Sequence, residues 1–180
     1  MVFCQLLDIE LPDSVRASLH SLLIGSALEQ PVTCVHRDFH SRNLMVVADD
    51  SPGVLDFQDA VAGPITYDLV SLLRDCYIAW PEQQINGWLS QYHQRLLENG
   101  LIDCDLNQFK RWFDLMGMQR HLKAIGIFSR LHLRDGKSNY LKDIPRTLNY
   151  VKTQALTYPE LADFSQFLQE LVLPVATLTA

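Results

Sequence analysis

The chain has 180 residues, of which 48 % are apolar and 20 % charged, a balance typical of a globular protein and not of a disordered or fibrous one. Its net charge of −6, without any basic cluster, argues against nucleic acid or an anionic membrane as a partner. No stretch approaches the roughly 20 apolar residues that a membrane span requires.

The cysteines and the N-terminus predict a cytoplasmic protein. The four cysteines lie 28 or more residues apart, too far for chelate spacing: Cys4, Cys34, Cys76 and Cys104. Cys34 and Cys76 lie within apolar runs, which favours buried, reduced thiols over a disulfide framework. The first residues lack the positive start of a secretory signal.

A helix is the first element predicted along the chain. Its start is marked by Pro-Asp-Ser at 12–14, and the apolar residues of 15–30 follow a helical period until Pro31. Three short strand-like runs come next, at 32–35, 43–47 and 53–57. The last two runs are separated by turn residues, Asp49, Asp50, Ser51, Pro52 and Gly53, and are therefore expected to form a hairpin.

Helices are predicted for the rest of the chain, after Gly63-Pro64. Their expected ranges are 66–76, 81–98, 105–136, 138–156 and 159–171. Asn99-Gly100 closes the second of them, and Pro145 is expected to kink or break the fourth. Asp105 is expected to cap the long third helix, whose aromatic residues at 109, 112 and 113 should lie in the core. The fold class is therefore α+β, mainly α, with one lobe over residues 1–180.

Three polar residues near the predicted hairpin carry the chemical information. Asp38 is followed five residues later by Asn43, and Asp56 comes 13 residues after Asn43, at a strand end. Taken singly, Asp38 and Asn43 read equally well as turn residues that bond their own backbone. The joint spacing favours convergence on one point. Carboxylates and an amide there would suit phosphoryl transfer, which needs positioning, charge neutralisation and an oriented hydroxyl.

The motif His36-Arg37-Asp38 followed by Asn43, and then Asp56-Phe57, resembles the catalytic-loop and metal signature of protein-kinase-like enzymes. Gln58 stands where D-F-G has glycine, which resembles the aminoglycoside phosphotransferase and choline kinase family. Within about residues 32–150, three longer segments resemble a bacterial branch of that family. They are 36–46, 55–80 and 111–137. Its members phosphorylate the anomeric hydroxyl of N-acetylmuramate or N-acetylglucosamine in cell-wall recycling.

The resemblance implies a role for each motif residue. Asp38 would be the catalytic base, and Asn43 and Asp56 would hold Mg²⁺ against the phosphates of ATP. His36 would support the loop, and Asp68 would cap its helix near the loop.

Four further residues have two interpretations each. His40 is either a loop-anchoring histidine or a contact to phosphate or substrate. Arg74 and Asp75, expected in mid-helix, are either a surface pair or a contact to the acceptor. Arg120 either pairs within its helix or contacts the sugar.

The N-terminal lobe that covers ATP in such kinases is expected to be missing. The five lysines all follow Asp56, whereas the ATP lysine precedes the catalytic loop: they are 110, 123, 137, 142 and 152. A truncated chain and a degenerate one both fit this pattern. The alternatives to a sugar kinase are an aminoglycoside, choline or homoserine-type kinase of the same family, or a pseudokinase-like binding module.

Overall fold

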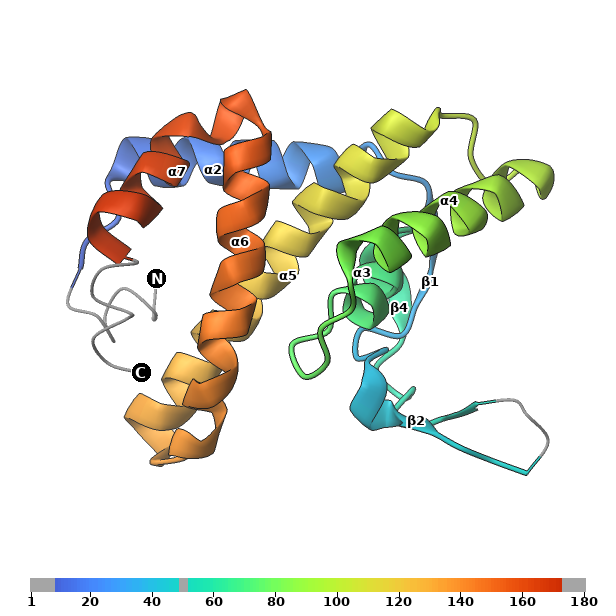
Figure 1. Ribbon diagram of the computed structural model, residues 1–180, viewed down its shortest axis with the longest axis horizontal. Helices are drawn as coiled ribbons and strands as arrows, with labels where there is room; N and C mark the ends of the chain where they lie inside the picture. Colours follow the sequence, from blue (N-terminus) through green and yellow to red (C-terminus); the bar gives the residue numbers. More distant parts are fainter. Residues whose placement is uncertain (1–8, 49–51, 173–180) are drawn as a thin grey trace. The chain divides into compact units, whose positions relative to one another are not determined.

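The computed structural model describes residues 9–48 and 52–172, so Cys4 and the predicted turn residues 49–51 lie outside the described residues. The chain divides into two compact units. We call Ser26–Gly117 the central unit, and Met1–Gly25 with Met118–Ala180 the terminal unit. Most of the described chain is helical, with two small antiparallel sheets (Figure 1).

The two sheets belong to the central unit. The predicted hairpin is confirmed, because β2 (Leu44–Met45) pairs antiparallel with β3 (Gly53–Val54). The hairpin points away from the helices α3 and α4 of the same unit (Figure 1). The first predicted strand is β1 (Val32–Val35), which pairs antiparallel with β4 (Val61–Pro64). The sequence did not predict β4, because its Gly-Pro end reads as a turn.

The β1–β4 ribbon buries one end and exposes the rest of β1. Val35 is 2 % exposed, whereas Val32 is 71 % exposed and Cys34 is exposed as well. The predicted burial of Cys34 is therefore wrong, because a two-stranded ribbon covers few of its side chains when only one end packs on helices. Cys76 and Cys104 are half-buried, and all three described cysteines are free thiols.

The helices of the central unit are α3 (Tyr67–Leu73), α4 (Glu82–Glu98) and the first part of α5 (Leu106–Asp135). α3 ends about three residues earlier than predicted. α4 ends as predicted, because Gly100 takes a left-handed φ of 65° that favours glycine at this position.

Buried apolar side chains from α3, α4 and α5 form the core of the central unit. Phe109 and Phe113 are fully buried and Trp112 is 6 % exposed, which confirms the predicted core role of these aromatics. Asp105 caps α5 as predicted, since its carboxylate accepts a hydrogen bond from Gln108 N at 2.8 Å. The rest of the core consists of Ile65, Val70, Leu73, Ile85, Leu89, Leu96, Ile102 and Met116.

The terminal unit is helical in its described part. It contains the first part of α2 (Asp13–Leu28) and the end of α5. The elements that follow α5 are η2 (Ser138–Asp143), α6 (Ile144–Thr157), η3 (Pro159–Leu161), α7 (Ala162–Phe167) and the π-turn η4 (Leu168–Val172). The predicted break near Pro145 is confirmed, since η2 ends at Asp143 and α6 begins at Ile144. Pro145 lies in the first turn of α6, where a proline needs no N–H donor.

Stacked aromatic rings join α5 to the elements after it within the terminal unit. His121 stacks on Tyr150 of α6 with 4.8 Å between ring centroids, and Phe128 stacks on Tyr140 of η2 at 5.7 Å. Among the helices in the described ranges, none combines the length and the apolar character that crossing a membrane would take.

Candidate active site

The loop between β1 and β2 carries Asp38 and Asn43. It turns through η1 (Ser41–Asn43), and the Asp38 carbonyl accepts from His40 N at 3.0 Å and from Asn43 Nδ2 at 2.9 Å. The side-chain nitrogen of Asn43 therefore stabilises the turn, while its amide oxygen takes no part in this hydrogen bond. The Asp38 side chain is exposed, and no described residue hydrogen-bonds its carboxylate. The carboxylate is therefore available to a ligand.

A backbone hydrogen bond pairs Asn43 with Leu55, the residue directly before Asp56. Leu55 N donates to Asn43 O at 3.0 Å, which extends the β2–β3 ladder by one step toward the loop. Asp56 is exposed, and its Oδ1 accepts from Gln58 Nε2. The amide oxygen of Asn43 and the carboxylate of Asp56 are the hard oxygen donors that Mg²⁺ prefers. No cluster of three or more His, Cys, Asp or Glu side chains suited to a metal occurs in 9–48 or 52–172.

Backbone strain occurs in the β1–β2 loop and directly after the β2–β3 hairpin. Within the described ranges, Arg37 and Asp56 are the non-glycine residues with positive φ, at 79° and 65°. Each costs on the order of 1–3 kcal/mol. The surrounding hydrogen bonds hold both conformations, one residue before Asp38 and at Asp56 itself.

Asp68 holds the start of the loop. Its Oδ2 accepts from His36 N at 2.6 Å and its Oδ1 from Arg37 N at 3.0 Å. Asp68 lies in the first turn of α3. Its carboxylate caps backbone N–H groups of the loop, and not the start of α3 as predicted. Hydrogen bonds to a charged acceptor contribute about 1.5–3 kcal/mol each, enough to offset the left-handed backbone at Arg37.

Asp75 holds the middle of the loop. It follows α3, is 2 % exposed, and accepts from Ser41 N at 2.9 Å and from Tyr77 N at 2.8 Å. The sequence analysis missed this role. No local signal pointed to it, because Asp75 lies beyond the end of α3 and its partner Ser41 is 34 residues earlier in the chain.

Arg74 is buried, so the surface-pair interpretation of Arg74 and Asp75 is wrong. The guanidinium is 6 % exposed and donates through Nη1 to Asp114 of α5 at 2.6 Å, with Glu82 at 3.3 Å. Both residues lie beyond the end of α3, and not in mid-helix. Contact with an acceptor stays a prediction for both, and their burial does not favour it.

Aromatic contacts support both loop histidines. The His36 ring meets Phe39 edge-on at 5.7 Å, and the His40 ring meets Tyr77 edge-on at 5.4 Å. Tyr77 also lies under Arg42, whose Cζ is 3.5 Å from the ring centroid. These contacts agree with loop support. Arg120 belongs to the terminal unit, and its predicted sugar contact stays a prediction.

Tyr92 of α4 lies close enough to Asp68 to feel its charge. Burial, and then the negative charge of Asp68, raise the pKa of the Tyr92 hydroxyl above its ordinary value of 10.0. The carboxylate that holds the loop therefore also sets the electrostatics of the neighbouring α4 surface.

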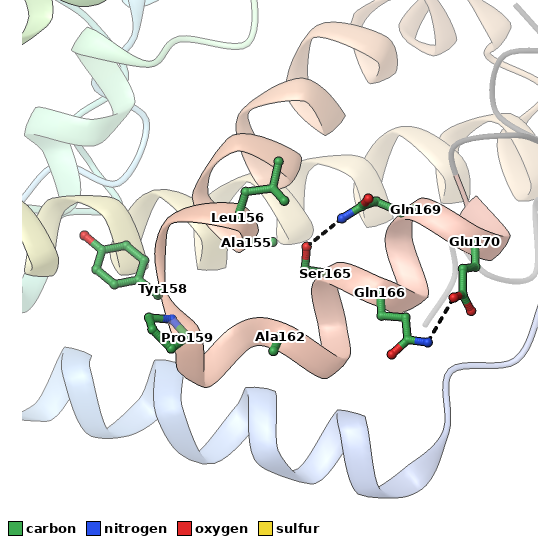
Figure 2. Close-up of a pocket in the computed structure, with 9 residues that line it drawn as sticks. All are labelled: Ala155, Leu156, Tyr158, Pro159, Ala162, Ser165, Gln166, Gln169 and Glu170. Carbon is green, nitrogen blue, oxygen red and sulfur yellow. Dashed lines mark hydrogen bonds between the residues drawn. The ribbon is translucent and has the colours of Figure 1, made fainter.

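Two hollows lie away from the predicted catalytic residues. One, of about 410 Å³, is in the central unit and is lined by Leu69, Leu72, Leu73, Trp80, Trp88, Gln91, Tyr92 and Arg95. The other, of about 460 Å³, lies in the terminal unit between α6 and α7 (Figure 2). Polar side chains on its α7 side pair with one another, Gln169 with Ser165 and Gln166 with Glu170. Neither hollow is lined by Asp38, Asn43 or Asp56; Asp38 and Asp56 are exposed and Asn43 is half-buried.

Comparison with known proteins supplies the family. Residues 2–101 match the model of the APH phosphotransferase enzyme family. Relatives named N-acetylmuramate/N-acetylglucosamine kinase come from Pseudomonas putida and Neisseria meningitidis serogroup B, and are 48 % and 50 % identical over 151 residues. The alignments cover 83 % of this chain but only 44 % and 45 % of those relatives, so the chain spans less than half their length. The loop geometry and the family match together show that this chain belongs to the phosphotransferase enzyme family.

Proposed function

We propose that this chain supplies the catalytic loop and metal-binding residues of an ATP-dependent kinase. Its acceptor is the anomeric hydroxyl of N-acetylmuramate or N-acetylglucosamine, and its place of action is cell-wall recycling in the cytoplasm. The observation that carries the proposal is the exposed Asp38 carboxylate, which receives no hydrogen bond from described residues. It lies on a loop whose Asn43 pairs through the backbone with Leu55, the residue before Asp56. The names of the relatives support the choice of acceptor.

The reaction requires little covalent help from the protein. Asp38 accepts the proton of the acceptor hydroxyl while the hydroxyl oxygen forms a bond to the γ-phosphorus of ATP. The bond from that phosphorus to the bridging oxygen breaks, and ADP leaves with the electron pair. Asn43 and Asp56 would hold Mg²⁺, which neutralises charge on the phosphates when bound. The bonds from Asp68 and Asp75 keep the loop in place before substrate arrives.

The part of the kinase that covers ATP is proposed to lie outside this chain. The relatives are more than twice as long as the matched region, which supports a further lobe. The test therefore uses a fusion of this chain with the part of the Pseudomonas putida relative that precedes the matched region. ADP release is measured with N-acetylmuramate, N-acetylglucosamine and kanamycin, and the two N-acetyl sugars should be clearly preferred. A preference for kanamycin would instead assign the chain to an antibiotic kinase.

The proposed catalytic residues are tested by substitution in the same fusion. Asp38→Asn should lower kcat by about 10²–10⁴-fold, because the hydroxyl loses its proton acceptor. Asp56→Ala should abolish transfer at any practical Mg²⁺ concentration, because the carboxylate is the stronger of the two ligands for a hard cation. Asp59→Asn is the matched control, since Asp59 lies exposed in the next turn. Wild-type turnover in Asp38→Asn or Asp56→Ala would refute the assignment.

A further inference from the structure

Arg42 is an exposed cation held in place within the catalytic loop. It lies in η1 directly before Asn43 and four residues after Asp38. Its guanidinium carbon lies 3.5 Å from the centroid of the Tyr77 ring. A cation at this distance from an aromatic face is attracted by the ring, which restricts the side chain without neutralising it.

The structure gives Arg42 no carboxylate partner among the described residues. The nearby Asp75 is buried, and its two oxygens accept from Ser41 N and Tyr77 N. Asp68 is likewise occupied by His36 N and Arg37 N. Both acids beside the loop are therefore committed to backbone amides, and the charge of Arg42 remains available to a ligand.

Other cations of the central unit are occupied or lie elsewhere. Arg74 is buried against Asp114, and Lys110 lies 3.6 Å from the same carboxylate. Arg95 is in the last turn of α4 and lines the hollow of about 410 Å³. Arg37, the other arginine of the loop, is half-buried, so Arg42 is the exposed arginine of the loop that presents Asp38.

We propose that Arg42 binds the carboxylate of N-acetylmuramate and so sets the preference between the two acceptors. The inference rests on the proposed function. The two sugars share the anomeric hydroxyl and the acetamido group, and differ by the lactyl ether on C3, which ends in a carboxylate. C3 is two ring positions from C1, and the ether oxygen and the lactyl carbon extend the carboxylate further from it. With C1 at Asp38, Arg42 on the same loop offers a cation to that carboxylate.

The exposure of Arg42 suits a site that accepts both sugars. A buried arginine without a partner would penalise the neutral sugar, because its charge would be left desolvated. An arginine that is exposed keeps its water when N-acetylglucosamine is bound and exchanges it for a carboxylate when N-acetylmuramate is bound. The cation therefore favours one acceptor without excluding the other.

The test compares kcat/KM for the two sugars in the fusion described above. Arg42→Gln should lower the value for N-acetylmuramate by about 10–30-fold, mainly through KM, because a charge-assisted hydrogen bond is lost. The value for N-acetylglucosamine should stay within about twofold, which also shows that the variant is folded. Arg42→Lys should keep part of the preference, and Arg95→Gln, the matched loss of one charge, should leave it unchanged.

The outcomes separate this inference from the proposed function. If Arg42→Gln lowers both acceptors equally or leaves their ratio unchanged, Arg42 is not the carboxylate site, although the kinase assignment stands. If the wild-type fusion phosphorylates neither sugar, the proposed function fails and this inference with it. Tyr77→Leu adds an independent check, because removal of the ring should lower the N-acetylmuramate preference by about threefold while Tyr77→Phe keeps it. If Tyr77→Leu leaves the ratio of kcat/KM values for the two sugars unchanged, Tyr77 does not position Arg42 for the carboxylate.

Discussion

At the scale of single residues, the loop depends on two acids whose own chemistry is not catalytic. Asp68 and Asp75 accept four backbone hydrogen bonds between them, from His36 N, Arg37 N, Ser41 N and Tyr77 N. Three of these donors belong to the loop that carries Asp38. The position of Asp38, the proposed catalytic base, is therefore set by residues that follow it in the sequence by 30 and 37 positions.

Asp75→Asn should destabilise the chain by about 1–3 kcal/mol, because the amide turns one acceptor into a donor facing a backbone N–H. Urea unfolding of the 180-residue chain measures this change. The exposed Asp59→Asn serves as the control and should stay within about 0.5 kcal/mol of wild type. Equal stabilities for the two variants would mean that the bonds from Ser41 and Tyr77 contribute nothing.

At the scale of elements, α3 connects the core to the loop. Its buried Val70 and Leu73 pack into the core, while Asp68 in its first turn reaches the loop. Arg74, directly after α3, pairs with Asp114 of α5. A buried pair of this kind is costly to break on one side only, by about 3–5 kcal/mol. Through these contacts, α3 holds the loop in a fixed position relative to the helical core of the central unit.

The charge of Asp68 gives this connection a spectroscopic signature. Asp68→Asn should lower the pKa of Tyr92 toward, but not to, its ordinary value of 10.0, because burial remains as the larger cause of the shift. Since the folded-state pKa is raised, stability falls as pH rises above the unfolded value of about 10. An NMR titration of the Tyr92 ring measures the shift. An unchanged pKa would mean that the charge of Asp68 does not act on Tyr92.

At the scale of the whole molecule, β1 and the residues that follow β2 and β3 expose large apolar side chains. Val46 is 100 % exposed, Val32 71 % and Phe57 67 %. Exposed apolar side chains mark an interface where they gather into one patch. The relatives, at more than twice the matched length, contain enough further chain to cover these side chains.

The 180-residue chain alone should show no measurable Mg²⁺-dependent ATP turnover with N-acetylglucosamine, whereas the fusion should be active. Without a cover over the phosphates, water enters and weakens the electrostatic stabilisation of transferred charge. Iodoacetamide should also label the exposed Cys34 of β1 readily in the chain alone and slowly in the fusion, as followed by peptide mapping. Comparable turnover in both forms would mean that this chain contains an ATP site of its own.

The local pattern of the sequence was enough to predict most elements and the family to which the loop motif belongs. The strand at 32–35, the hairpin, the capped start of α5 at Asp105 and the left-handed end of α4 at Gly100 each depend on neighbouring residues. Propensity, capping and turn rules act over that same short range. The spacing of Asp38, Asn43 and Asp56 was legible for the same reason, and the match to the family is confirmed.

Only the tertiary structure decided which residues hold the loop and which surfaces are left uncovered. The partners of Asp68 and Asp75 are more than 30 residues distant, apart from Tyr77, and no local rule relates them. Burial likewise placed Arg74 inside and Cys34 outside, against the expectation from their neighbours. Burial is a property of what packs on an element from elsewhere in the chain. Periodicity and composition identify an apolar segment, but the long-range packing that covers it exists only in the folded protein.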